Sequence, residues 1–180
     1  MSMLNIASVE KAVESEKLTS PASILNFTRK KIIETLAKDG SVEGGKDGMD
    51  CSLISFDFEK MELTYSAANN GIWILRKGSL LEFAPDKMPV GKHIHDQTPF
   101  KEQTIPIFKD DIVYSFTDGM ADQFGGPKGK KFKYKSLKDL LIEISSLPMI
   151  QQQAQLEKTL KDWKGDLEQV DDVCVIAVRV

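Results

Sequence analysis

Cysteine is scarce in this chain, which has only Cys51 and Cys174 in 180 residues. Neither has a second Cys or a His at ligand spacing, so no zinc site of the usual kind is indicated. A disulfide would need oxidising surroundings, which nothing else in the sequence suggests. Because free cysteine is among the most buried residue types, both are predicted to be buried free thiols within strands.

Long apolar runs and a surplus of one charge are also missing. No stretch approaches the roughly 18 consecutive apolar residues of a membrane span, and the amino terminus lacks the basic and then apolar profile of a signal peptide. Lys and Arg total 24 against 27 Asp and Glu, so a net charge of -3 gives no broad positive field for nucleic acid or anionic lipid. We therefore expect a cytoplasmic protein that contacts neither nucleic acid nor a membrane.

What is present is enough apolar material for one core. With 41% hydrophobic residues, the 180 residues are predicted to form a single domain, 1–180. Ser20 followed by Pro21 marks the start of a helix, and apolar residues recur at helical spacing until Gly40. The segment that follows, 40–48, is rich in glycine and is predicted to be a loop.

From residue 49 the apolar period changes from helical to two, which is typical of strands. Short connections between the first four strands favour an antiparallel meander, and both faces of the first are predicted to be buried. Two apolar stripes predict helices, one starting at a capping box of Ser136 and Asp139 and one containing Leu156 and Leu160. The last strand is hydrophobic enough to be a central one.

The fold class is therefore predicted to be α+β, with helices on antiparallel sheets. The strands are expected at 49–58, 61–67, 72–75, 80–83, 105–108, 112–116 and 173–180.

Acidic residues stand at the ends of three of these strands, in the segments 47–50 (DGMD), 117–119 (TDG) and 171–172 (DD). An Asp followed by Gly lets the backbone turn and bring its own carbonyl toward an ion. Hard cations such as Mg²⁺ or Mn²⁺ prefer oxygen ligands, and converging carboxylates repel one another unless a cation or proton lies between them. Taken singly, each segment fits an Asx turn equally well, and the sequence does not show whether they converge.

Further segments accompany these in a fixed order: 63–71 (LTYSAANNG), 88–91 (MPVG), 110–119 (DDIVYSFTDG), Phe124-Gly125 and 171–178 (DDVCVIAV). Together with 47–50 they resemble the SpoIIE-like branch of the protein phosphatase 2C (PP2C) family, from about Pro21 to the end of the chain. The resemblance implies two antiparallel sheets packed as a sandwich and flanked by helices (α-β-β-α), here lacking the first strands, with a metal centre at one edge.

The resemblance also assigns residues to that centre. Asp118 and Asp171 correspond to metal ligands, Gly119 belongs to the same metal-binding turn, and Asp172 is a neighbour that supports the loop. Asn70 falls where other branches have an aspartate linked to an accessory metal, and its neutrality argues against a third metal here.

The family's first metal motif is an Asp-Gly that bridges both metals, in a strand before the first long helix. Residues 1–5 resemble the interior of that helix, so we expect a fragment of a longer protein with a sensory domain upstream. The complete domain is expected to hold two Mn²⁺ or Mg²⁺, and the fragment alone could bind none and is expected to be inactive. The implied substrate is a phosphorylated regulatory protein, such as an anti-sigma-factor antagonist in bacterial signal transduction, and a homodimer is compatible with the resemblance.

Alternatives remain open. A phosphatase fold that has lost catalysis and binds a partner protein is the main one. A haloacid-dehalogenase-like phosphatase is disfavoured, because no Asp-x-Asp leads the chain. His93 and His95 could ligate a metal but lack a nearby third zinc ligand, the lysine-rich run 128–135 could contact an acidic partner, and the glycine-rich stretch 119–129 is predicted to be a mobile flap beside Asp118.

Overall fold

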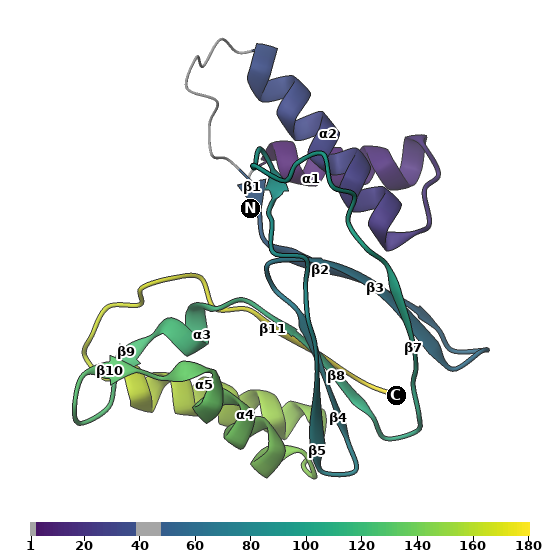
Figure 1. Cartoon of the computed structure of the whole chain (residues 1–180). Helices are drawn as coiled ribbons and strands as arrows, with labels where there is room; N and C mark the ends of the chain where they lie inside the picture. The colour runs from purple at the N-terminus through teal and green to yellow at the C-terminus, as the bar shows by residue number, and fades with distance from the viewer. Residues whose placement is uncertain (1–2, 39–47) are drawn as a thin grey trace. The chain divides into compact units, whose positions relative to one another are not determined.

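A computed structural model describes residues 3–38 and 48–180 (Figure 1). The chain forms two compact units, and it passes between them at residues 71–72, 83–84 and 107–108. Unit 1 comprises Met1–Gly71 and Ala84–Ile107, and unit 2 comprises Ile72–Phe83 and Phe108–Val180. No described helix is both long and apolar enough to cross a membrane.

Unit 1 combines an amino-terminal helical segment with a three-stranded antiparallel sheet in the order β2-β3-β7. The same unit contains a two-stranded ladder of β1 with β6. The elements are α1 (Met3–Glu10), a π-helical turn (Lys11–Ser15), α2 (Pro21–Lys38), β1 (Gly48–Met49), β2 (Cys51–Asp57), β3 (Glu62–Ala68), β6 (Val90–Gly91) and β7 (Gln103–Pro106).

Helix α2 begins as the sequence predicts. Pro21 is its first residue, and the hydroxyl oxygen of Ser20 accepts a hydrogen bond from the Ser23 amide at 3.3 Å, as an N-cap does. Its apolar side, including Leu25 and Ile32, packs in the core of unit 1. Gly40 lies outside the described residues, so the predicted helix end and loop 40–48 stay predictions apart from Gly48, which begins β1.

The prediction that both faces of the first strand are buried is wrong. The residues of β2 are half-buried or exposed, and Phe58 just beyond it is 58% exposed. The reason is position: among the described strands β2 lies at the edge of its sheet, whereas β3 is central and has the buried side chains. The strand expected at 105–108 is displaced to Gln103–Pro106, where it pairs with β3.

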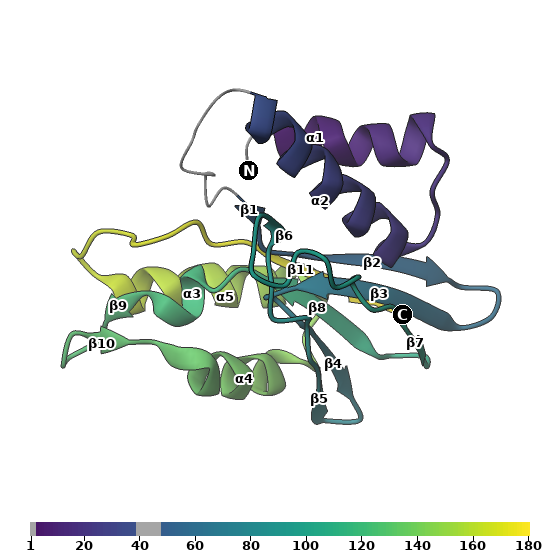
Figure 2. The ribbon, with the colours of Figure 1, turned by 45° about the horizontal axis from the view of Figure 1, so that its top comes forward.

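Unit 2 contains a four-stranded antiparallel sheet in the order β11-β8-β4-β5. Helices α4 and α5 lie along one face of it (Figure 2), and their apolar residues share a core with Trp73, Tyr114 and Phe116 of the strands. The elements are β4 (Ile72–Arg76), β5 (Ser79–Phe83), β8 (Ile112–Phe116), α3 (Gly119–Asp122), β9 (Phe124–Gly125), β10 (Lys130–Lys131), α4 (Lys133–Ile144), α5 (Met149–Lys164) and β11 (Val175–Arg179).

Three expectations for these elements need correction. The first four strands form no single meander, because β3 belongs to one sheet and β4 to the other, with Asn69 in a left-handed conformation (φ 58°) between them. Helix α4 begins at Lys133, so Ser136 lies inside it and forms no capping box. Strand β11 is an edge strand among those described, and its Ile176 is 60% exposed. The α+β class with antiparallel sheets is confirmed, whereas the single domain stays a prediction.

Candidate functional site

Two of the three predicted acidic segments meet at one end of unit 2. Strands β8 and β11 are antiparallel, with Phe116 opposite Val175. The residues that follow β8 therefore lie at the same end as those that precede β11. The amide of Thr117 donates to the carbonyl of Cys174 at 3.0 Å and extends the ladder by one step. This register brings segment 117–119 beside segment 171–174.

The hydroxyl of Thr117 fixes these two segments together. Its oxygen accepts a hydrogen bond from the Cys174 amide at 2.9 Å, and it donates to the carbonyl of Asp172 at 2.8 Å. One side chain thus satisfies two backbone groups in a loop where no ladder partner is left for them. Sequence reasoning missed this role of Thr117, although a threonine directly before Asp-Gly at a strand end is a signal that could have been tested.

Gly119 allows the backbones of the two segments to approach closely. A Cβ atom built on Gly119 would lie 2.4 Å from the carbonyl oxygen of Asp172 and 2.9 Å from its carbonyl carbon. Both neighbours are backbone atoms that cannot rotate away. The predicted site residues Gly119 and Asp172 are therefore in direct backbone contact, and any larger residue at 119 would force the segments apart.

The carboxylates at this end differ in exposure. Asp118 is half-buried at the start of the short helix α3, and its carbonyl accepts a hydrogen bond from the Asp122 amide at 2.9 Å. Asp171 and Asp172 are exposed. One carboxylate oxygen of Asp171 accepts a hydrogen bond from the Asp172 amide at 2.7 Å, and its carbonyl accepts one from the Gln169 side chain at 2.8 Å.

A buried glutamine, Gln123, holds the loop that leads to Asp171. Its side-chain nitrogen donates to the carbonyls of Phe124 and Glu168, both at 3.0 Å, and its side-chain oxygen accepts from the amide of Val170 at 3.3 Å. Its backbone carbonyl accepts two further bonds, from the Phe132 amide at 2.9 Å and the Trp163 indole at 3.0 Å. Sequence reasoning missed Gln123, because nothing in the local sequence marks a glutamine for burial.

Two aspartates place negative charge near Tyr134 at this end. Tyr134 lies near α3, and its pKa is raised above the ordinary value, mainly by burial and further by the charges of Asp118 and Asp122. A negative charge opposes the formation of a phenolate, and the same field attracts a cation. Lys131 offsets part of it by pairing with Asp122 at 3.0 Å.

Carboxylate oxygens and backbone carbonyls at a glycine turn are the kinds of ligand that a divalent cation needs. The number of ligands falls short, however. Among residues 3–38 and 48–180, no three His, Cys, Asp or Glu side chains converge closely enough to hold a metal ion. The described residues thus offer part of a coordination sphere, and water or other residues would have to complete it. The assignment of Asp118, Gly119, Asp171 and Asp172 to a metal stays a prediction.

The other candidate metal ligands named from the sequence lie in unit 1. Asp47 falls outside the described residues, and the exposed Asp50 accepts a hydrogen bond from the side chain of Asn69 at 2.8 Å. The rings of His93 and His95 are 5.4 Å apart, but their neighbour Asp96 pairs with Lys92 at 2.8 Å. Because the Asp96 carboxylate pairs with a lysine, it does not serve as a third ligand, and the two histidines are residues of a surface loop.

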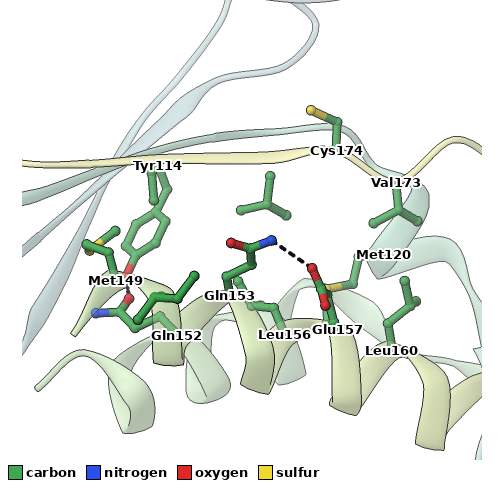
Figure 3. A pocket seen from close by; sticks show the side chains of 13 residues that line it. Tyr114, Met120, Met149, Gln152, Gln153, Leu156, Glu157, Leu160, Val173 and Cys174 are labelled. Carbon is green, nitrogen blue, oxygen red and sulfur yellow. Dashed lines mark hydrogen bonds between the residues drawn. The ribbon is translucent and has the colours of Figure 1, made fainter. Parts of the chain in front are cut away.

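An apolar pocket of about 650 Å³ lies between helix α5 and strands β8 and β11 (Figure 3). The hydroxyl of Tyr114 donates to Gln152 at the floor of the pocket, at 3.0 Å, and burial raises the pKa of Tyr114 to about 12.

Cys174 is exposed at the margin of this pocket, so the prediction of a buried thiol is wrong there. Cys51 in unit 1 is half-buried, and burial raises its pKa to about 12. Both thiols are free, as predicted.

Comparison with known proteins identifies a matching family and solved structures with a similar fold. The family model described as stage II sporulation protein E (SpoIIE) matches residues 1–180. The PP2C domain of SiaA from Pseudomonas aeruginosa has a similar structure, with a TM-score of 0.87 and 23% identity over 99% of this chain and 68% of that one. A search of curated proteins found no significant match.

Two further structures share the fold at lower similarity. One contains the PP2C phosphatase domain and a fragment of the regulatory domain of SpoIIE from Bacillus subtilis, with a TM-score of 0.70 and 15% identity over 98% of this chain and 48% of that one. The other is the catalytic domain of the serine/threonine phosphatase PstP in complex with two manganese ions, with a TM-score of 0.63 and 14% identity over 98% and 78%. These likenesses confirm the predicted fold.

Proposed function

Because the chain belongs to the SpoIIE family, we propose that it is the carboxyl-terminal part of a metal-dependent protein phosphatase domain, acting on phosphoserine or phosphothreonine in a regulatory protein. The observation that carries this proposal is the direct contact between Gly119 and Asp172. It brings together two acidic segments that lie more than fifty residues apart in the sequence. A turn-forming role for each segment alone would not require that contact.

In this proposal Asp118 and Asp171 ligate metal, Gly119 belongs to the metal-binding turn, and Asp172 supports the loop through its carbonyl. Two bound Mn²⁺ or Mg²⁺ ions would supply a water of lowered pKa and neutralise the phosphate. Other residues would hold the ligand-bearing segments in position. Thr117 holds segment 171–174 to the end of β8, and Gln123 fixes the backbone at Glu168 and Val170.

The longer protein belongs to the proposal as well. The Bacillus subtilis SpoIIE structure includes a fragment of a regulatory domain, and we infer a sensory domain upstream in the same polypeptide here. The complete site would take its bridging carboxylate from that upstream part. A phosphorylated anti-sigma-factor antagonist in the cytoplasm fits such a regulator as a substrate, and a homodimer fits it as an assembly.

Substitution of the two ligands tests the proposed activity. In the complete polypeptide, Asp118→Asn and Asp171→Asn should each lower Mn²⁺-dependent hydrolysis of a phosphoserine peptide by at least about 100-fold, because changes in a metal's second shell alone cost about 10- to 100-fold. Asp110→Asn is the matched control, since Asp110 is an exposed aspartate at the other end of β8 and should retain activity. Full activity in both ligand variants would refute the assignment.

A second candidate function is a phosphatase fold that binds a partner without catalysis. The incomplete ligand set of the described residues favours it. Calorimetric titration of the complete polypeptide with Mn²⁺ separates the two, because the phosphatase must bind the metal and an inactive module need not.

A further inference from the structure

Unit 2 has a concentration of positive charge that the phosphatase proposal leaves unexplained. Residues 124–135, here termed the lysine hairpin, contain five lysines and no Asp or Glu. They comprise β9, β10, the turn between them and the first turn of α4. In a chain whose net charge is -3, such a group is a local feature that the overall composition does not predict.

Only part of this charge is compensated within the unit. Lys131 pairs with Asp122 at 3.0 Å and Lys135 with Asp139 at 2.7 Å. For Lys128, Lys130 and Lys133, the described part of the chain provides no carboxylate at salt-bridge distance. All three are exposed, so the hairpin presents about three unneutralised positive charges to solvent.

The base of the hairpin is held firmly. The Gly126 amide donates to the carbonyl of Trp163 at 2.8 Å, and a Cβ on Gly125 would lie 1.8 Å from that same oxygen. The ring of Phe132 packs edge-on against Trp163 with centroids 5.3 Å apart. The charges are therefore displayed on an anchored backbone, and binding of a partner would cost little backbone ordering entropy.

The hairpin adjoins the candidate site. The Asp122 carboxylate that pairs with Lys131 is one helical turn from Asp118, whose carbonyl accepts the Asp122 amide. Figure 1 shows β9 and β10 beside α3. Phe124 on the hairpin is 42% exposed, with the Lys131 ammonium 5.8 Å from its ring centroid, and adds an apolar contact to the basic surface.

We propose that the lysine hairpin is a docking surface for an acidic segment of the protein substrate, a run of Asp or Glu beside the phosphorylated residue. That the partner is a substrate rests on the proposed function, and the acidic chemistry of the segment rests on charge complementarity. Lysine ammonium groups without carboxylate partners attract acidic side chains, while the metals would take the phosphate. Exposed ion pairs are weak one at a time, so the selectivity should come from several together.

Binding of two phosphoserine peptides tests it directly. The peptides are identical and fluorescently labelled, except that one carries Glu and the other Gln at the flanking positions. Fluorescence anisotropy should show that the 180-residue chain binds the Glu peptide about tenfold more tightly at low salt, and that added salt removes most of the difference. Lys128→Ser with Lys130→Ser should lower affinity for the Glu peptide about three- to tenfold and leave the Gln peptide unchanged.

Lys77→Ser with Lys109→Ser is the matched control. Lys109 precedes β8 and Thr117 follows it, so they lie at opposite ends of a strand of five residues, about 17 Å long. Lys77 follows β4, whose Leu75 pairs with Ile112 at that far end. The control should bind both peptides as the unaltered chain does. Equal affinity for the two peptides, or equal loss in both lysine variants, would overturn the inference.

The proposed function is assayed separately, by Mn²⁺-dependent hydrolysis of p-nitrophenyl phosphate in the complete polypeptide. This small ester has no flanking acids, so the hairpin variant should hydrolyse it at the unaltered rate. Absence of hydrolysis with selective peptide binding would remove the phosphatase proposal and keep the acidic docking surface. Hydrolysis without selective binding would do the reverse.

Discussion

At the scale of single residues, the candidate site depends on two small side chains. Thr117 uses one hydroxyl to satisfy backbone groups of Asp172 and Cys174, and Gly119 leaves room for the Asp172 carbonyl. Neither residue can ligate a metal through a charged side chain. Both determine instead where the neighbouring carboxylates lie.

Substitution of Gly119 by Ala should therefore damage the fold and the site together. The added methyl would overlap the Asp172 carbonyl at 2.4 Å, where backbone must shift to relieve it. We expect the free energy of unfolding to fall by about 2–3 kcal/mol, in the upper part of the range for overpacked sites, because the overlap is with backbone. Urea denaturation of the 180-residue chain measures this value.

Gly129→Ala provides the control for that change. Gly129 has a positive φ of 56°, but no atom lies within 4 Å of the position that an added Cβ would take, so this variant reports backbone strain without overlap. Its cost should be about 1–2 kcal/mol at most. If the free energy of unfolding falls by the same amount in both variants, the close approach at Gly119 does not affect stability.

Some of these residue-scale features could be predicted from the sequence. Asp118, Gly119, Asp171 and Asp172 stand out as acidic or turn-forming residues at strand ends, and the segments that hold them do meet. The partner of the Thr117 hydroxyl could not be predicted, because it lies 55 residues away and depends on the register of β8 with β11. Cys174 lies just before β11, and its exposure is not revealed by the apolar sequence around it.

At the scale of elements, the positions of the strands in the sequence were predicted better than the pairing of those strands in the sheets. The apolar pattern is a local property, so it located β3, β8 and β11 well. Which strands pair is decided by packing over the whole unit, and so the expected meander divided into two sheets. The start of α4 was missed for a related reason. Buried Phe132 packs on Trp163 and precedes the helix, whereas Ser136 merely resembles a cap.

The loop between α5 and β11 should loosen when Gln123 is changed to Leu. The substitution removes three side-chain hydrogen bonds, to Phe124, Glu168 and Val170, from a fully buried position. Because unsatisfied buried polar groups cost about 1–3 kcal/mol each and some here can reach water, we expect a loss of about 2–4 kcal/mol in stability. Hydrogen exchange at the Val170 amide should also accelerate.

Gln153→Leu is the matched control, since Gln153 is exposed on α5 and its side chain donates to Glu157 at 2.8 Å. Its effect on stability should stay within about 0.5 kcal/mol. Unchanged exchange at Val170 in the Gln123 variant would show that this glutamine does not hold the loop.

At the scale of the whole molecule, family membership supports the proposed activity, and the proposed metal ligands lie in segments that meet at one end of unit 2. The SpoIIE family model matches residues 1–180, and the solved domains extend beyond it, since this chain covers 68% of the SiaA domain structure and 48% of the SpoIIE one. The described residues supply only part of a ligand set; a longer phosphatase domain would complete it with further ligands, whereas an inactive module would need none. The lysine hairpin would add a choice of substrate to that chemistry.

The central claim is that Asp118 and Asp171 serve one metal centre. A crystal structure of the complete polypeptide grown with Mn²⁺, with data collected at the manganese absorption edge, measures this directly. The account predicts anomalous density within about 2.5 Å of a carboxylate oxygen of each residue. Manganese bound elsewhere, with either carboxylate turned away from it, would contradict the account.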